Sequence, residues 1–129
     1  MKTREIPREE WNEFFDSFSR QHEGWLVTLE VLGHEIGAQV EEHDLSFGGI
    51  ANEWDEIHGN QIVIMLGSKP HDHISHSIDR PTHVFLEQTD EGADVALSVR
   101  SGDGITALLR FRTAILPEMV DAIFVPART

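Results

Sequence analysis

The sequence predicts a mainly β fold, in which one N-terminal helix is followed by an antiparallel sheet of six or seven strands. Aromatic residues recur at helical spacing over residues 11–18, and from residue 25 onward apolar and polar residues alternate at the period of a strand. Near the end of the chain, two alternating segments form a hairpin whose apolar faces agree in one register. Such a sheet either curves with the helix across its concave face or closes into a small barrel, and we favour the barrel because it leaves fewer exposed edges.

The helix is expected to begin at Pro7 and to end near Gly24. Proline suits the first turn of a helix, since its missing N–H has no partner there anyway, and glycine commonly follows the last turn. One stripe of this helix carries Trp11, Phe14, Phe15 and Phe18. At this spacing the four rings share one face, which we interpret as the surface that docks on the sheet.

Residues 25–31 predict the first strand of the sheet, because the odd positions are apolar while Thr28 and Glu30 alternate with them. Residues 61–66 are almost continuously apolar, which is typical of a central strand. Weaker strands are expected at 38–42, with Ala38 and Val40 facing inward, at 74–78 and at 83–88. Between the strands we expect a turn at 33–37, an irregular apolar segment at 45–50, and polar loops at 52–60 and 68–72.

The last hairpin can be aligned by its apolar positions. A three-residue loop, Gly102 to Gly104, lets the apolar faces of the two strands match, and Gly104 can take the left-handed position of such a loop. The expected pairs are Val99 with Ala107, Leu97 with Leu109 and Val95 with Phe111. The opposite face then carries Arg100, Arg110 and Arg112, whose charge Asp94 or Glu87 would offset.

The length of 129 residues favours a single domain over residues 1–129, with a core at about 5–113 and a C-terminal tail at 114–129 that includes a short helix. The chain has no cysteine, which excludes disulfides and thiolate metal sites. No apolar run approaches the roughly 20 residues that span a bilayer, and the first residues do not resemble a signal peptide. We therefore expect a soluble, cytoplasmic protein.

The charge balance excludes several classes of partner. Asp and Glu number 23 against 10 Lys and Arg, a formal net charge of −13, and no Lys or Arg lies between Arg20 and Lys69. This field repels phosphate backbones and anionic lipid, so we expect neither a nucleic acid nor a membrane as partner. Because the acids are spread along the chain, we interpret them as a halophilic adaptation to a salty cytoplasm, where ions screen their repulsion. The alternative is an ordinary acidic protein that meets a basic partner or a cation.

Histidine is the one chemically rich element of the sequence. A cluster is formed by His71, His73, His76 and His83. Neutral imidazoles that face the same way on a strand can share a divalent ion such as zinc, so one hypothesis is a metal-binding protein or a metal-dependent hydrolase. The alternative is a polar loop and strand surface, with His76 half-buried beside Ile74 and Ile78. The zinc-protease, phosphate-loop and nucleophile-elbow motifs do not occur.

Without an assembled catalytic set, we expect a protein that is not an enzyme and needs no cofactor. Its function would be to bind a protein partner, a second copy of itself or a small ligand. The apolar segment at 45–50 is the expected contact surface if it is exposed, with Leu45, Phe47 and Ile50 as its contact residues.

Four strings resemble a family of small bacterial proteins classed as a domain of unknown function: Thr3–Pro7, Glu23–Glu30, Ile36–Val40 and Pro81–Glu87. The resemblance covers roughly residues 3–112. It implies a complete, single-domain bacterial protein, and it brings no catalytic residue, ligand or mechanism with it.

Overall fold

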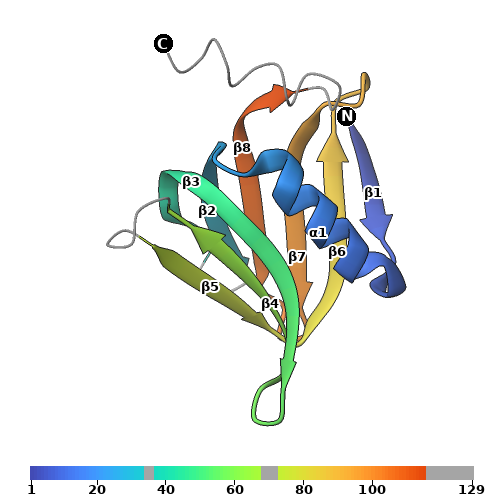
Figure 1. Cartoon of the computed structure of the whole chain (residues 1–129), viewed down its shortest axis with the longest axis vertical. Helices are drawn as coiled ribbons and strands as arrows, with labels where there is room; N and C mark the ends of the chain where they lie inside the picture. Colours follow the sequence, from blue (N-terminus) through green and yellow to red (C-terminus); the bar gives the residue numbers. More distant parts are fainter. Residues whose placement is uncertain (34–36, 68–72, 116–129) are drawn as a thin grey trace.

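The computed structural model describes residues 1–33, 37–67 and 73–115, and Figure 1 shows its elements. A first strand, β1 (Lys2–Ile6), leads through the 3-10 turn η1 (Arg8–Glu10) into the helix α1 (Trp11–His22). The other strands are β2 (Leu26–Gly33), β3 (Gly37–Asp55), β4 (Gly59–Leu66), β5 (Ile74–Asp79), β6 (Pro81–Gln88), β7 (Asp94–Ser101) and β8 (Thr106–Ile115). The predicted mainly β fold with an N-terminal helix is confirmed.

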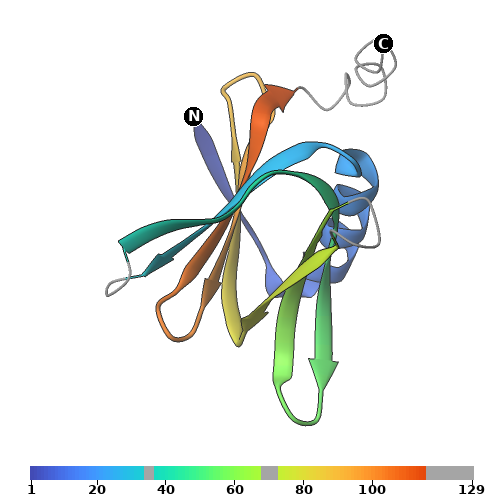
Figure 2. The ribbon, with the colours of Figure 1, turned by 90° about the vertical axis from the view of Figure 1, so that its left-hand side faces the viewer.

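The strands form one antiparallel sheet of 8 strands in the order β1-β6-β7-β8-β2-β3-β4-β5. The sheet is open, with β1 and β5 as its edges, so the curved sheet is found and not the barrel. Figure 2 shows β4, β5 and the second half of β3 turned away from the plane of the other strands. In Figure 2, α1 lies beside the part of the sheet that turns away. In Figure 1, α1 crosses the face of β6 and β7.

The strand β1 was not predicted, because it lacks an apolar alternation. Only Ile6 of its five residues is buried, and the others are exposed. The strand exists because it pairs with β6, where Ile6 lies opposite Val84. Main-chain pairing at a sheet edge leaves little signal in the side chains.

The strand β3 is one continuous element of 19 residues that joins the two halves of the sheet. Its first half pairs with β2 and its second half with β4. The expected irregular segment at 45–50 is therefore part of this strand, and the expected loop at 52–60 is reduced to the short turn between Asp55 and Gly59. Ala38 and Val40 are exposed, not inward, because they lie opposite Leu32 and Glu30, on the outer face of β2.

Gly48 allows β3 to bend toward the second half of the sheet. A Cβ at this position would lie 3.1 Å from the carbonyl oxygen of Met65 on β4, where the register shifts between Phe47 and Gly49. The helix fixes the bend from the other side. The Ser19 hydroxyl accepts a hydrogen bond from the N–H of Ile50 at 2.9 Å and donates one to its carbonyl at 3.1 Å.

The core lies between α1 and rows of apolar residues that continue from strand to strand. One row comprises Ile6, Val84, Val99, Ala107 and Val31, and the next comprises Leu86, Leu97, Leu109 and Leu29. The helix contributes Trp11, Phe15 and Phe18, all buried, while Phe14 is partly buried against them. The predicted docking stripe is thus confirmed. Helix α1 begins at Trp11 after the η1 turn that follows Pro7, and Gly24 has the left-handed φ of 86° just beyond its end.

The last hairpin forms with two of its three expected pairs. Val99 lies opposite Ala107 and Leu97 opposite Leu109, and Gly104 has a φ of 88°. The third pair, Val95 with Phe111, is not formed, because the register shifts between Asp94 and Ala96. The expected turn residues 34–36, the loop at 68–72 and the tail helix beyond 115 lie outside the described residues. Within the described part of the chain, no helix is long and apolar enough to cross a membrane.

We expect Phe15→Ala to lower the free energy of unfolding by about 3–5 kcal/mol, because truncation leaves a cavity between α1 and the sheet. Phe15 is 1% exposed. Urea denaturation measures the change. Val40→Ala is the control, since Val40 is 58% exposed and should alter the free energy by less than about 0.5 kcal/mol. Equal effects of the two substitutions would contradict the described packing of α1.

Candidate functional site

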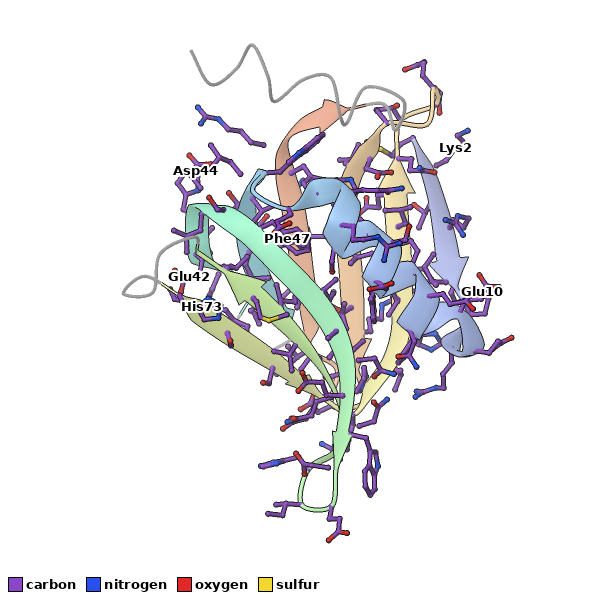
Figure 3. All side chains as sticks on the ribbon, viewed as in Figure 1. Lys2, Glu10, Glu42, Asp44, Phe47 and His73 are labelled. Carbon is purple, nitrogen blue, oxygen red and sulfur yellow. The ribbon has the colours of Figure 1, made fainter. Side chains whose placement is uncertain are left out.

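The structure does not bring together those predicted metal ligands that it describes. His71 lies outside the described residues, and His73 is exposed just before β5. Figure 3 shows His73 near Glu42, away from β6. His83 lies on β6, where its Nδ1 is 2.8 Å from Oε2 of Glu5. Among the described residues, no group of three or more His, Asp or Glu could hold a metal ion, so the metal hypothesis is not favoured.

The three residues expected to form a contact surface belong largely to the core. Phe47 and Ile50 are 1% and 3% exposed, and Leu45 is partly buried against the core cluster. Figure 3 shows Phe47 between β3 and α1. Their apolar side chains hold the bent strand β3 onto the helix, so they do not offer an exposed surface.

A buried pair of polar side chains, which the sequence did not predict, joins the end of α1 to β7. Nε2 of His22 lies 3.0 Å from Oδ2 of Asp94, with side chains that are 1% and 9% exposed. The imidazole is enclosed by the rings of Phe18, Trp25 and Phe111 at centroid distances of 4.3, 5.3 and 4.6 Å. The approach of the two atoms lacks good hydrogen-bond geometry, so the contact is electrostatic and not a directed hydrogen bond.

The other ring nitrogen of His22 and the other oxygen of Asp94 each have a hydrogen-bond partner. Nδ1 of His22 lies 2.8 Å from the carbonyl oxygen of Phe18, and it donates the hydrogen bond because a carbonyl oxygen can only accept. Oδ1 of Asp94 accepts a hydrogen bond from Gln88 at 2.9 Å. These two hydrogen bonds orient the imidazole and the carboxyl group toward each other.

The register shift in β7 explains why Asp94 points inward. Regular alternation from Leu97 would place Val95 on the inner face and Asp94 on the outer face. The shift between Asp94 and Ala96 instead places Asp94 opposite Gln88, beside His22. The expected role of Asp94 as a neighbour of the outer arginines is therefore wrong. Arg110 pairs with Glu30 at 3.1 Å, and Arg100 lies over the ring of Phe85.

Asp94 also lines a groove of about 270 Å³ between α1 and the strands β1, β6 and β7. Phe14 and Phe18 form its helical wall, and Arg4 lies on the side of β1. The carboxylate of Asp94 is already engaged by His22 and Gln88. We therefore do not treat this groove as a separate ligand site, because the carboxylate that lines it already contacts His22 and Gln88.

A cavity of about 200 Å³ lies where edge strand β5 faces β2, β7 and β8, and we call it the seam cavity. Its apolar lining consists of Leu29, Val31, Ile78, Ile105 and Ala107. Its polar lining consists of His76, Ser77, Asp79, Ser101 and Asp103. No residue of α1 is among them, so the helix leaves this part of the inner face uncovered.

His76 is the histidine that lines the seam cavity. It shares a face with Ile78 and its side chain is 27% exposed, so the prediction of a half-buried position is confirmed. Its Nε2 is buried without a hydrogen bond and lies 3.5 Å from Oε2 of Glu42. This contact with Glu42 ties β5 to β3 across the inner face of the sheet.

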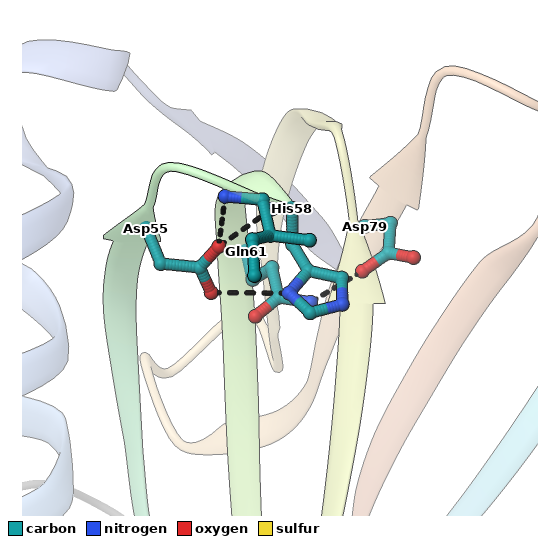
Figure 4. Close-up of polar contacts among 5 residues, drawn as sticks. Asp55, His58, Gln61 and Asp79 are labelled. Carbon is teal, nitrogen blue, oxygen red and sulfur yellow. Dashed lines mark hydrogen bonds and ion pairs between the residues drawn. The ribbon is translucent and has the colours of Figure 1, made fainter.

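Two carboxylates stand at the rim of the seam cavity. Asp79 accepts a hydrogen bond from Nε2 of Gln61 at 2.6 Å, as Figure 4 shows. A hydrogen bond from the Ser101 hydroxyl holds the pKa of Asp103 below its ordinary value, which keeps this carboxyl charged. Arg80 lies 3.9 Å from Asp103. The rim therefore carries two negative charges against one positive charge.

The comparisons with known proteins give a family and no activity. The model described as "Family of unknown function (DUF5335)" matches residues 2–119. An "Uncharacterized protein" of Aquifex aeolicus (strain VF5) is 33% identical over 120 residues, which cover 92% of this chain and 100% of that protein. No solved structure matches significantly.

We expect Asp94→Ala to lower the free energy of unfolding by about 3–5 kcal/mol, because it leaves Nε2 of His22 buried without a partner. Asp90→Ala is the matched control. It removes a carboxylate from the same hairpin, where the side chain is 74% exposed and pairs with the N-terminus, and its effect should stay below about 1 kcal/mol. Urea titrations compare the two, and an effect of Asp94→Ala no larger than the control would contradict the role of this pair.

Proposed function

This chain belongs to the DUF5335 family of unknown function, and we propose from its geometry that it binds a small apolar amine in the seam cavity. The observation that carries the proposal is the pairing of an apolar wall with a rim of carboxylates. Leu29 and Ala107 are 0% and 4% exposed on the wall, while Asp79 and Asp103 stand at the rim. Ligand sites commonly combine an apolar lining with a few fixed polar groups.

The size of the cavity suits a ligand with one aromatic ring or a short alkyl chain. A dry cavity of about 150 Å³ is enough to bind benzene in a protein core, and the seam cavity is about 200 Å³. Burial of the apolar body would supply most of the affinity.

The charge of the ligand follows from the charge of the protein. Asp79 and Asp103 would attract an ammonium group at the rim, and the formal net charge of −13 raises the local concentration of cations. The same field disfavours a carboxylate or phosphate ligand. An amine therefore fits both the local and the global electrostatics.

Three molecules that share one aromatic ring and differ in the polar group test this proposal: benzylamine, benzyl alcohol and benzoate. In NMR titrations at neutral pH, we expect benzylammonium to bind most tightly and benzoate most weakly, with shifts at the residues that line the seam cavity. Asp79→Asn should weaken benzylammonium binding by about fivefold, which corresponds to a partly exposed ion pair of about 1 kcal/mol. Benzyl alcohol binding should not change.

Two further variants complete the test. Asp90→Asn makes the same change of charge at an exposed site and should leave binding unchanged. Ala107→Leu fills the floor of the cavity and should reduce the binding of all three molecules. Equal affinities for the three molecules, or shifts located in the groove beside Arg4, would contradict the proposal.

We also propose that the acidic surface suits this protein to a bacterial cytoplasm of high ionic strength. Exposed acids include Glu9, Glu10, Glu53, Glu56 and Glu91. Salt shortens the range of their mutual repulsion from about 10 Å at 0.1 M to about 3 Å at 1 M.

Thermal unfolding in KCl measures the effect of salt. Raising KCl from 0.1 M to 2 M should raise the unfolding midpoint by about 5 °C, the shift that corresponds to about 1 kcal/mol in a domain of this size. A variant with Glu9, Glu10, Glu53 and Glu56 changed to Gln should gain less from the salt, because it carries less repulsion to screen. An unchanged or lower midpoint of the wild type in 2 M KCl would exclude this adaptation.

A further inference from the structure

The hairpin formed by β3 and β4 presents two large apolar side chains at its tip. Trp54 is 70% exposed and Ile57 is 87% exposed, which makes Ile57 the most exposed large apolar residue of the described chain. Figures 1 and 2 both show this hairpin extending beyond the other strands. An exposed tryptophan is unfavourable in water alone, and tryptophan is among the residues that most often dominate binding between proteins.

The side chain of Asp55 hydrogen-bonds across the turn at the tip. Its Oδ1 accepts hydrogen bonds from the backbone N–H groups of Ile57 and His58, and its Oδ2 lies 3.2 Å from Nδ1 of His58 (Figure 4). The backbone hydrogen bond from His58 lowers the pKa of Asp55, so the carboxylate stays charged and the turn stays closed. Gly59 completes the turn with a φ of 71°. A preformed tip loses less entropy when it docks.

The charges around the tip define the kind of surface that it fits. Glu53, Asp55 and Glu56 are exposed next to the two apolar residues. The chain has no Lys or Arg between Arg20 and Lys69, so no basic residue of this segment offsets them. A second copy of this protein would carry the same negative charge, and an anionic membrane would be repelled.

From these observations we propose that the hairpin tip docks into an apolar pocket rimmed by Lys or Arg on a partner protein. Trp54 and Ile57 fill the pocket, and the surrounding carboxylates pair with its basic rim. The tip is a separate site from the seam cavity, because neither Trp54 nor Ile57 lines that cavity. The docking proposal therefore does not depend on amine binding.

A peptide of alternating lysine and leucine serves as the probe for this chemistry, and a glutamate and leucine peptide of equal length serves as its charge control. The readout is the indole Nε1–H signal of Trp54, which is assigned by its absence in Trp54→Phe. We expect the basic peptide to shift this signal and the acidic peptide to leave it unchanged. The double variant Trp54→Ala with Ile57→Ala should bind the basic peptide about tenfold more weakly or worse.

Val40→Ala is the matched control variant, because it removes an exposed apolar side chain from the same strand, away from the tip. It should bind the basic peptide as the wild type does. Unchanged unfolding midpoints of all variants confirm that they fold. Three results would overturn the proposal: equal binding by wild type and double variant, no binding of the basic peptide, or a Trp54 shift with uncharged phosphatidylcholine vesicles in place of the peptide.

Discussion

The docking of α1 on the inner face of the sheet is the contact on which the rest of the structure depends. The rings of Trp11, Phe15 and Phe18 fill the space between the two halves of the sheet. At the end of the helix, His22 meets Asp94 and ties α1 to β7. On the other side, Ser19 holds β3 through both backbone groups of Ile50. One helix thus fixes the curvature of the whole sheet.

The two proposed sites, the seam cavity and the hairpin tip, lie where α1 does not cover the sheet. Because α1 contributes no residue to the seam cavity, the apolar rows end there against β5 and leave space beside Ala107. Because β3 continues past the part that α1 covers, its far end forms a hairpin with Trp54 and Ile57 in water. Each site therefore lies at the margin of the sheet, beyond the surface that α1 covers.

Elements with a short-range signal could be predicted, and elements defined by pairing could not. The aromatic stripe of α1 and the alternation in β2 and β7 each repeat within a few residues, so their periods identify them. The edge strand β1 has no such period, and it exists through its main-chain pairing with β6. The bend in β3 was predicted as an irregular segment, because paired glycines such as Gly48 and Gly49 are as common in loops as in bent strands.

The same distinction between local sequence signal and long-range pairing applies to the candidate site residues. The half-buried position of His76 followed from its alternation with Ile74 and Ile78, whereas the pairing of His83 with Glu5 depends on a strand that the sequence did not reveal. Asp94 was assigned to the wrong face, because a register shift cannot be seen in one strand alone. The contact residues Phe47 and Ile50 are apolar enough for an interface, and only the position of α1 shows that the core uses them.

The sequence by itself determined the helix, most of the strands, the register of the last hairpin next to its loop and the strong negative charge. These properties depend on local periodicity and on composition, which do not require knowledge of distant neighbours. The tertiary structure alone decided that the sheet stays open, that His22 and Asp94 meet, that the described histidines do not gather, and that the seam cavity and the hairpin tip exist. Each of these depends on which distant segments pair, and that pairing is set by the packing of the whole chain around α1.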